Sequence, residues 1–224
     1  MLTVHHLDQS RSQRVLWLLE ELELPYEVRQ YRRDPVTLLA PPELKTVHPL
    51  GKSPVISDGD VVVAETGAIF EYLCSLRAGT PLVPVAGMAA HRRYTYWLHF
   101  AEGSAMPPLL LKMIFDRIAS APMPFFAKPI ARAISAKVLD GYVDPNLRAQ
   151  LAFMEAELSR RAWFAGDAFT AADIMMSFPL EAARQRAGLS AATHPLLSGW
   201  LDAIHARAAY QRALARGGPY SLSV

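Results

Sequence analysis

The sequence predicts an α+β domain followed by an all-helical domain. Strand-like alternation of apolar and polar residues is confined to residues 1–79, whereas apolar residues from Met88 onward recur at helical spacing. A stretch with Gly and Pro breakers, residues 80–88, lies between the two patterns. We therefore predict domains at 1–79 and 89–224, joined by a linker at 80–88.

The first domain begins with a strand, a helix and a second strand. Residues 2–7 form a short apolar run, and residues 15–22 carry an apolar stripe at helical spacing. Pro25 ends that helix, and residues 26–31 alternate like a strand.

The remainder of the first domain reads as a loop, a hairpin and a helix. Residues 34–54 are irregular and rich in Pro. Two short strands at 55–57 and 61–64 flank a tight Asp-Gly-Asp turn, and helical spacing resumes at 65–76. This order of elements predicts one compact α+β unit.

The second domain has no strand-like alternation. Breakers separate its helical stretches, and the first of them contains Pro107 and Pro108. The predicted helices span 88–118, 124–139, 145–161, 171–187 and 195–215.

Composition excludes several classes of protein. Of 224 residues, 51% are hydrophobic and 20% are charged, which excludes a disordered chain. The formal charge is +2 without a dense basic run, so we expect no nucleic-acid partner. No apolar run approaches the roughly 18 residues of a membrane span and no signal segment opens the chain, so we expect a cytoplasmic protein without a membrane partner.

We expect no metal site. Cys74 is the single cysteine, which excludes an intrachain disulfide and a multi-cysteine site. The seven histidines show neither HxH nor HExxH spacing. Cys74 falls on the apolar side of a predicted helix, where we expect an inert buried thiol.

Ser10 lies where the first strand gives way to the first helix. With Gln13 it fits a capping box, which is a structural role. A hydroxyl at the positive end of a helix dipole is also placed to stabilise a thiolate or another anion. No histidine or acid lies at a triad spacing, so we expect no serine nucleophile.

Two further segments suit a ligand. The segment before the hairpin enters its strand through Pro54, which leaves the main chain of Ser53 free to pair with an extended ligand; a plain loop is the alternative. Glu65 and Thr66 open a helix, where an acid and helix N–H groups suit an ammonium and a carboxylate. An ordinary helix start is the alternative there.

The helical domain contains a second capping box and many methionines. Thr170 and Asp173 have the capping spacing, so we predict a structural role for both and no part in catalysis. Methionines such as Met106 and Met113 either fill a core or form a surface that accepts varied apolar partners.

Together, the order and spacing of these motifs resemble the cytosolic glutathione S-transferase family. The resemblance rests on the stretches SRSQRVLWLLEELELPYE, APPELKTVHPLGKSPV, AETGAIFEYL and FTAADIMMSFPL. It implies a thioredoxin-like N-terminal domain, glutathione as co-substrate and a homodimer. The Ser-Arg-Ser sequence after the first strand is similar to bacterial and fungal serine-type members.

The resemblance implies that Ser10 is the catalytic residue. It matches the serine that hydrogen-bonds the glutathione sulfur, and Ser12 is the next candidate. The early tyrosine of tyrosine-type members has no counterpart, because Asp8 occupies that region. The cysteine of redox-type members is replaced by Ser10, which argues against disulfide reduction.

The resemblance also implies how the other parts of glutathione bind. Pro54 matches the family's cis-proline, and the main chain of the preceding Ser53 pairs with the cysteinyl part. Family members most often have an apolar residue where Ser53 stands, a change that a main-chain contact tolerates. Lys52 reaches the glycyl carboxylate, with His48 as a weaker candidate.

The remaining implied contacts concern the γ-glutamyl end and the second substrate. Glu65 and Thr66 match the acid and hydroxyl that hold the γ-glutamyl end, although the family most often has Ser in place of Thr66. An apolar electrophile binds against the helical domain, where Met106 and Met113 are our candidates.

These observations predict a glutathione S-transferase that conjugates the glutathione thiolate to apolar electrophiles, as in detoxification. Lowering a thiol pKa by roughly 2 units from its usual value requires about 2.7 kcal/mol of preferential thiolate stabilisation. A hydrogen bond from Ser10 and the helix N-terminus can supply energy of that order. Two alternatives remain: a glutathione-dependent peroxidase acting on organic hydroperoxides, and a non-catalytic glutathione-transferase-like binding module.

Overall fold

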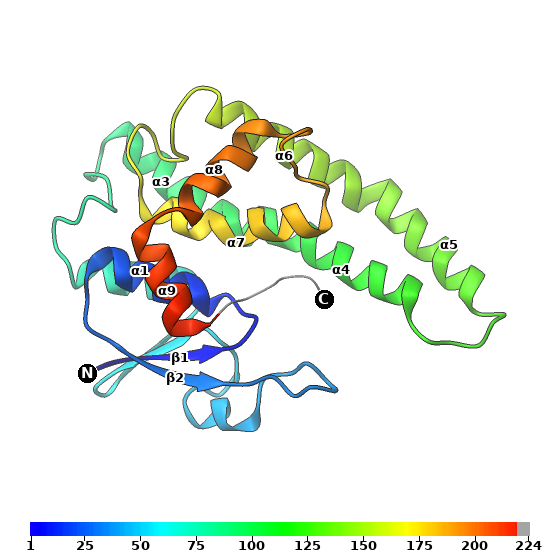
Figure 1. Cartoon of the computed structure of the whole chain (residues 1–224), viewed down its shortest axis with the longest axis horizontal. Coiled ribbons are helices and arrows are strands. Elements are labelled where there is room, and N and C mark those ends of the chain that lie inside the picture. Colours follow the sequence, from blue (N-terminus) through cyan, green and yellow to red (C-terminus); the bar gives the residue numbers. More distant parts are fainter. Residues whose placement is uncertain (219–224) are drawn as a thin grey trace.

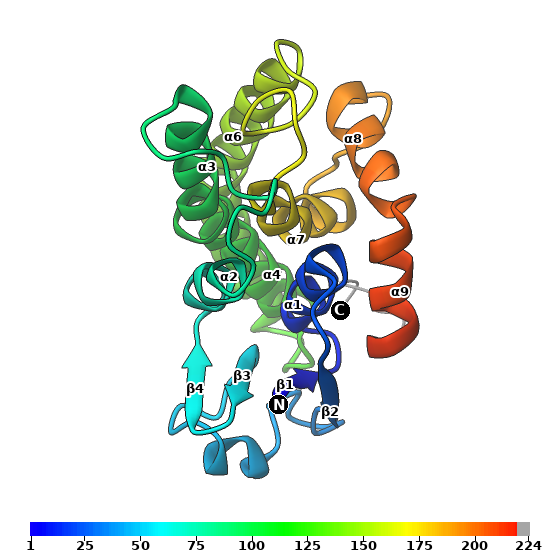
Figure 2. The same ribbon diagram turned by 90° about the vertical axis from the view of Figure 1, so that its left-hand side faces the viewer.

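The computed structural model describes residues 1–218 of the chain. Within them, a thioredoxin-like N-terminal domain with a four-stranded mixed sheet is followed by an all-helical domain (Figures 1 and 2). In Figure 2 the sheet lies at the bottom and the helical domain above it. This is the fold class that the sequence predicts; the exact domain boundaries stay a prediction.

The strands take the order β2-β1-β3-β4. β1 (Leu2–Leu7) pairs in parallel with β2 (Glu27–Tyr31) and antiparallel with β3 (Val55–Asp58). β3 turns back into β4 (Val61–Ala64) through a tight turn in which Gly59 has a φ of 57°, a conformation that favours glycine. The predicted hairpin is therefore confirmed.

The two faces of β1 meet different neighbours, because side chains alternate along a strand. His6 shares a face with Leu2 and Val4, which belong to the core that the helices complete. Leu7 lies on the opposite face and packs with Tyr31 in a smaller cluster. His6 therefore faces the helical side of the molecule.

Helices α1 (Ser12–Leu22) and α2 (Thr66–Ser75) lie between the sheet and the helical domain (Figure 2). Most of α1 is buried because it packs against β1 on one side and against α7 and α9 on the other. It ends where Glu23 takes a left-handed conformation and donates its N–H to the carbonyl of Leu19. The predicted irregular loop contains one short 3₁₀ helix, Pro42–Thr46.

The helical domain consists of helices joined by turns and by longer loops, such as the loop between Leu158 and Ala171. No helix of residues 1–218 is long and apolar enough to cross a bilayer. Its helices are α3 (Ala89–Phe100), α4 (Met106–Ser120), α5 (Lys128–Val138), α6 (Asp144–Leu158), α7 (Ala171–Arg186), α8 (Pro195–His205) and α9 (Ala208–Gly217).

π-helical turns change the first predicted helices of this domain. The stretch predicted as one helix is α3 and α4, joined by a π turn at Ala101–Ala105. A second π turn, Leu139–Val143, joins α5 to α6 without the expected break. Pro107 and Pro108 fall in the first turn of α4, where proline is tolerated. Each π turn adds a residue without ending the helix, so periodicity does not reveal it.

The last predicted helix is also two helices. Arg207, between α8 and α9, has an extended backbone with φ −66° and ψ 133°. The chain turns there, and α9 runs back beside α1 (Figure 2). The guanidinium of Arg207 then binds the Glu21 carboxylate at N–O distances of 2.6 and 2.8 Å. The break between α8 and α9 therefore accompanies a contact with α1, a segment distant in the sequence.

The capping box predicted at the start of α7 is confirmed. The Asp173 carboxylate accepts the Thr170 N–H at 2.9 Å and the Thr170 hydroxyl at 3.1 Å. It also accepts the N–H of Phe164 at 3.0 Å, which ties the preceding loop to the helix. Asp173 is completely buried, in agreement with a structural role.

Candidate functional site

A cavity of about 370 Å³ opens between the N-terminal domain and helices α4 and α7. Ser10 and Ser53 line it from the N-terminal domain, and Met106 and Met113 line it from α4. Four residues predicted from separate parts of the sequence are therefore brought together in one space.

One face of α4 forms the apolar wall of this cavity. Met106, Leu110 and Met113 recur at the spacing that places side chains on one side of a helix, and Arg117 continues the same row. Phe178 of α7 completes the wall. This surface is suited to an apolar group.

Ser10 lines the cavity but does not form the predicted capping box. Its Oγ lies 2.7 Å from the Oγ of Ser12 and accepts the Ser12 N–H at 3.3 Å. The side-chain amide of Gln13 has no hydrogen-bond partner among residues 1–218. Gln13 instead packs against α9, where a Cβ added to Gly217 would lie 2.6 Å from its Oε1.

Ser12 is completely buried behind Ser10. Its Oγ lies 2.8 Å from Nδ1 of His6 and 3.3 Å from the carbonyl oxygen of Leu7. The Nε2 of His6 lies 3.1 Å from the carbonyl oxygen of Gly217. Of the two serines, Ser10 lines the cavity. Ser12 does not, and its hydroxyl links Ser10 to the buried His6 by hydrogen bonds.

Ser53 borders the cavity from the loop before β3 and is followed by the buried Pro54. Their peptide bond is cis, as the family resemblance implies. The Ser53 hydroxyl donates to the carbonyl of His5 at 2.9 Å and accepts the N–H of Leu7 at 3.3 Å. The main chain of Ser53 makes no hydrogen bond to other main-chain groups of residues 1–218, so it can pair with a ligand.

The other predicted binding residues do not line this cavity. Lys52 is exposed, and His48 is partly buried and accepts the N–H of Leu50 at 3.4 Å. Thr66 is buried at the start of α2. Glu65 is exposed and has a φ of 71°, a strained backbone for a residue other than glycine. Glu65 stands at the N-cap position of α2, but its side chain makes no capping hydrogen bond. An ordinary helix start and a binding role both stay predictions for Glu65 and Thr66.

The cavity is more basic than the sequence indicated. Its lining includes four arginines and no acidic side chain from residues 1–218, and such a site favours anionic ligands. Sequence reasoning missed them because they come from four separate segments. The arginines are Arg11, Arg33, Arg117 and Arg186.

A buried ion pair supports the wall of the cavity. Arg14, which is 1% exposed, donates to Glu102 of the first π turn at 2.5 Å and to the carbonyl of Met175 at 2.7 Å. Its guanidinium lies 5.1 Å from the centre of the Phe178 ring. Burial alone would raise the pKa of Glu102, but the charges of Arg14 and Arg11 outweigh it and lower that pKa. Glu102 therefore serves these arginines as a counter-ion.

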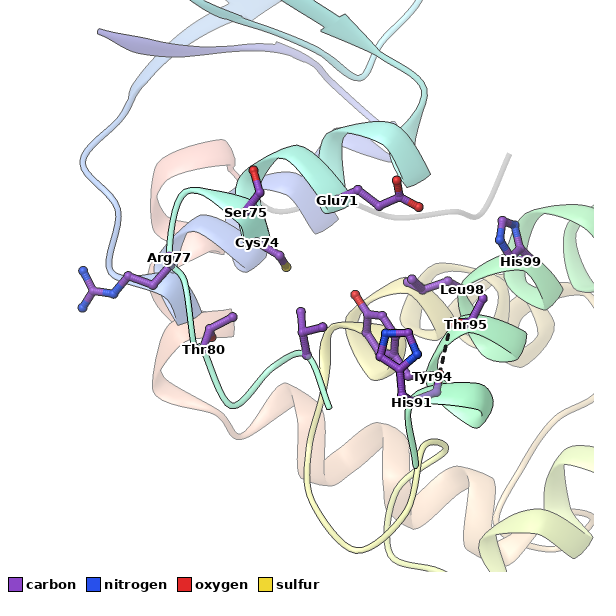
Figure 3. Close-up of a pocket in the computed structure, with 12 residues that line it drawn as sticks. Glu71, Cys74, Ser75, Arg77, Thr80, His91, Tyr94, Thr95, Leu98 and His99 are labelled. Carbon is purple, nitrogen blue, oxygen red and sulfur yellow. Dashed lines mark hydrogen bonds between the residues drawn. The ribbon is translucent and has the colours of Figure 1, made fainter. Parts of the chain in front are cut away.

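A second cavity, of about 410 Å³, lies between α2, the segment after it and the start of α3 (Figure 3). Cys74 and Tyr94 face each other across it. Burial raises the pKa of the Cys74 thiol to about 11, so the thiol is protonated at neutral pH. None of its lining residues belongs to the first cavity.

Comparisons with known proteins identify the two parts of the chain. Residues 10–76 match the glutathione S-transferase N-terminal domain, and residues 119–208 match the glutathione S-transferase C-terminal domain. Glutathione S-transferase 1 of Saccharomyces cerevisiae is 35% identical, with 94% of this chain and 92% of the yeast protein covered. Glutathione S-transferase 3 of Schizosaccharomyces pombe is 34% identical, with 93% and 85% covered.

Solved structures show the same fold over almost the whole chain. A glutathione S-transferase from Actinobacillus pleuropneumoniae superposes with a TM-score of 0.79 at 30% identity, covering 99% of this chain and 94% of its own. A sphingomonad glutathione S-transferase solved in complex with glutathione superposes with a TM-score of 0.73 at 22% identity, covering 96% and 98%. The chain is therefore a glutathione transferase and belongs to the cytosolic glutathione S-transferase family.

Proposed function

We propose that this enzyme conjugates the glutathione thiolate to apolar electrophiles in the cavity between its two domains. The observation that carries the proposal is the meeting of three features in one space: the Ser10 hydroxyl, the Ser53 main chain and the apolar face of α4. The first suits a sulfur, the second an extended peptide and the third an apolar second substrate.

Glutathione lies across the edge of the N-terminal domain in this proposal. Its cysteinyl part pairs with the main chain of Ser53, which brings the sulfur to Ser10. The glycyl carboxylate reaches Lys52, with His48 nearby, and the γ-glutamyl end reaches the start of α2. The strained φ of Glu65 supports a role at that end, because strained backbones cluster at ligand sites.

The second substrate binds against the α4 wall, between Met106 and Met113. Because arginines surround this wall, we expect the preferred electrophiles to combine an apolar body with an acidic group. Arg117 stands on the same face of α4 as the methionines and is placed to meet that group. Detoxification of such compounds is the proposed biological role.

An ultraviolet titration of bound glutathione tests the proposal. We expect the thiolate absorbance to appear at a pH about 2 units below that of free glutathione, because the site stabilises the anion. Ser10→Ala should bring this pKa back toward its usual value and reduce turnover, whereas Ser159→Ala, on an exposed turn of the helical domain, should change neither.

The outcomes of this titration separate the alternatives. Binding with an unshifted pKa, or no binding, would favour the non-catalytic module. A lowered pKa with turnover of organic hydroperoxides but not of aryl halides would favour the peroxidase. If the pKa of the bound thiol is unchanged in Ser10→Ala, Ser12 and not Ser10 contacts the sulfur.

We also propose a homodimer, which the family resemblance implies, and a cytoplasmic location, which the sequence favours. Light scattering of the purified protein at micromolar concentration should give the mass of two chains. The mass of one chain would contradict the dimer without affecting the proposed chemistry.

A further inference from the structure

A continuous line of hydrogen bonds runs from the cavity into the interior. Ser10 Oγ lies 2.7 Å from Ser12 Oγ, which lies 2.8 Å from His6 Nδ1. On the far side of the ring, His6 Nε2 lies 3.1 Å from the carbonyl oxygen of Gly217. His6 is 4% exposed, so water does not replace these partners.

The carbonyl of Gly217 fixes the direction of this line. A carbonyl oxygen only accepts hydrogen bonds, so Nε2 of His6 carries a hydrogen. Burial lowers the pKa of His6, against the opposing effects of the Gly217 carbonyl and of Asp8, so its ring is neutral before a ligand binds. A neutral ring has one N–H, and its Nδ1 is therefore an acceptor.

The hydroxyls must then point inward. Ser12 donates its proton to Nδ1 of His6, which leaves its oxygen to accept the proton of Ser10. The Ser10 oxygen also accepts the Ser12 N–H, which leaves it one further lone pair, and Ser10 lines the cavity. In this state Ser10 is an acceptor for a thiol S–H group and not yet a donor to a thiolate.

We propose that His6 accepts the proton of the glutathione thiol through Ser10 and Ser12; this inference rests on the proposed function. The S–H bond breaks and its proton passes to Ser10 Oγ. Ser10 passes its own proton to Ser12, and Ser12 passes its proton to His6 Nδ1. One proton is transferred in all, and the products are a thiolate and an imidazolium.

The shift reverses each hydrogen bond in the line. Ser10 now donates to the thiolate, Ser12 donates to Ser10, and the imidazolium donates to Ser12 from Nδ1 and to Gly217 from Nε2. Every donor keeps an acceptor, so the buried ring holds its charge without an unpaired N–H group.

Burial disfavours the imidazolium, whereas several charges and dipoles at the site favour the ion pair. In water, transfer from a thiol to an imidazole is about 100-fold unfavourable, because the two pKa values differ by about 2 units. Attraction between the thiolate and imidazolium, together with the N-terminus of α1, opposes that difference. Asp8 also favours the charged ring, while α1 and α9 present to it the neutral Ser12 hydroxyl and Gly217 carbonyl.

A proton count tests the proposal directly. The protein is mixed with glutathione in weakly buffered indicator dye at a pH below the thiol pKa, and thiolate absorbance and released protons are measured together. We expect a thiolate with almost no proton release in the wild-type enzyme. Release of one proton per thiolate would overturn the role of His6, whereas the absence of any thiolate would contradict the proposed function instead.

Variants give the matched comparison. His6→Asn places an amide near the former Nδ1 but cannot accept a proton, so each thiolate should now release one proton. His5→Asn is the control, because His5 is equally buried on the opposite face of β1, bonded to Tyr31 and Ser57. It should behave like the wild type, and identical proton counts for His6→Asn and the wild type would refute the proposal.

Two further measurements do not depend on the folding of His6→Asn. Ser12→Ala interrupts the line without replacing a residue of β1 and should also release one proton per thiolate. In the wild type, ¹⁵N NMR of the imidazoles should show one histidine change from the neutral Nε2–H form to imidazolium when glutathione binds. S-methylglutathione, which has no thiol proton, should cause no such change. A histidine spectrum unchanged by glutathione would overturn the proposal.

Discussion

The starts of α1 and α7 show how a single side-chain contact decides whether a capping box forms. The capping pattern at Thr170 and the pattern at Ser10 look alike in the sequence, yet only the former closes into a capping box. The difference lies in Gln13, which faces Gly217 of α9 instead of its own helix start. A local pattern predicts local structure correctly where no distant segment competes for the same side chain.

The candidate site could be predicted in part for the same reason. Ser10, Ser53 and the cis bond at Pro54 belong to short motifs, and the structure brings both serines to one cavity. The link between Ser12 and His6 was not predicted. The histidine acquires its orientation from Gly217, and no local motif in the sequence predicts such a contact.

Removing the Asp173 carboxylate should affect stability and not catalysis. In Asp173→Ala, the N–H groups of Thr170 and Phe164 lose a buried acceptor, so we expect the free energy of unfolding to fall by about 3 kcal/mol. Denaturant titration measures this loss, and kcat corrected for the folded fraction should match the wild type. A fall in corrected kcat with unchanged stability would contradict the structural role.

Cys74 should react slowly in the native enzyme. Its thiol pKa of about 11 leaves little thiolate at pH 7, and the reactive fraction should rise about tenfold per pH unit up to that value. Alkylation with iodoacetamide followed by mass spectrometry measures the rate, with denatured protein as the reactive reference. Rapid alkylation of the native protein at pH 7 would show that the thiol is neither buried nor protonated.

At the level of elements, the strands and most helices follow from hydrophobic periodicity. β1, the β3–β4 hairpin and α7 lie where the sequence predicts them. The π turn at Ala101–Ala105 was not predicted, because one inserted residue shifts the apolar stripe without interrupting it. It changes which side of α4 faces the cavity, so the apolar wall could not be assigned from spacing alone.

The row of side chains along α4 should also set substrate preference. Arg117→Gln is expected to raise KM for an electrophile carrying a carboxylate by about threefold to fivefold, because one exposed charge contact is lost. KM for a neutral electrophile should stay unchanged. Arg148→Gln, an exposed position on α6 outside this cavity, is the control. Equal effects on both electrophiles would rule out recognition of the acidic group.

At the level of the whole molecule, the two domains share one core. The main cluster of buried residues runs from Leu2 of β1 to Ala213 of α9. Two ion pairs from α1 reinforce it: Glu21 binds Arg207 at the start of α9, and Glu20 binds Arg212 within α9. The domains that the sequence separates are therefore not independent in packing.

We therefore expect the protein to unfold in one transition. Trp17 reports on the N-terminal domain and Trp97 and Trp200 on the helical one, so tryptophan fluorescence and far-ultraviolet circular dichroism should give the same denaturant midpoint. Two separate midpoints would show that the shared core does not couple the domains. Dissociation of a dimer depends on protein concentration, whereas unfolding of a single chain does not. Urea titrations at two protein concentrations therefore distinguish the two processes.

The contact between His6 and Gly217 joins residues that are 211 positions apart in the chain. A ribosome adds about 5 to 20 residues per second, so β1 and α1 are made roughly ten to forty seconds before the end of α9. Throughout that interval the growing chain has both serines but not the carbonyl that orients the histidine. A chain released early would lack this contact, so the helix made last completes the site begun by the strand made first.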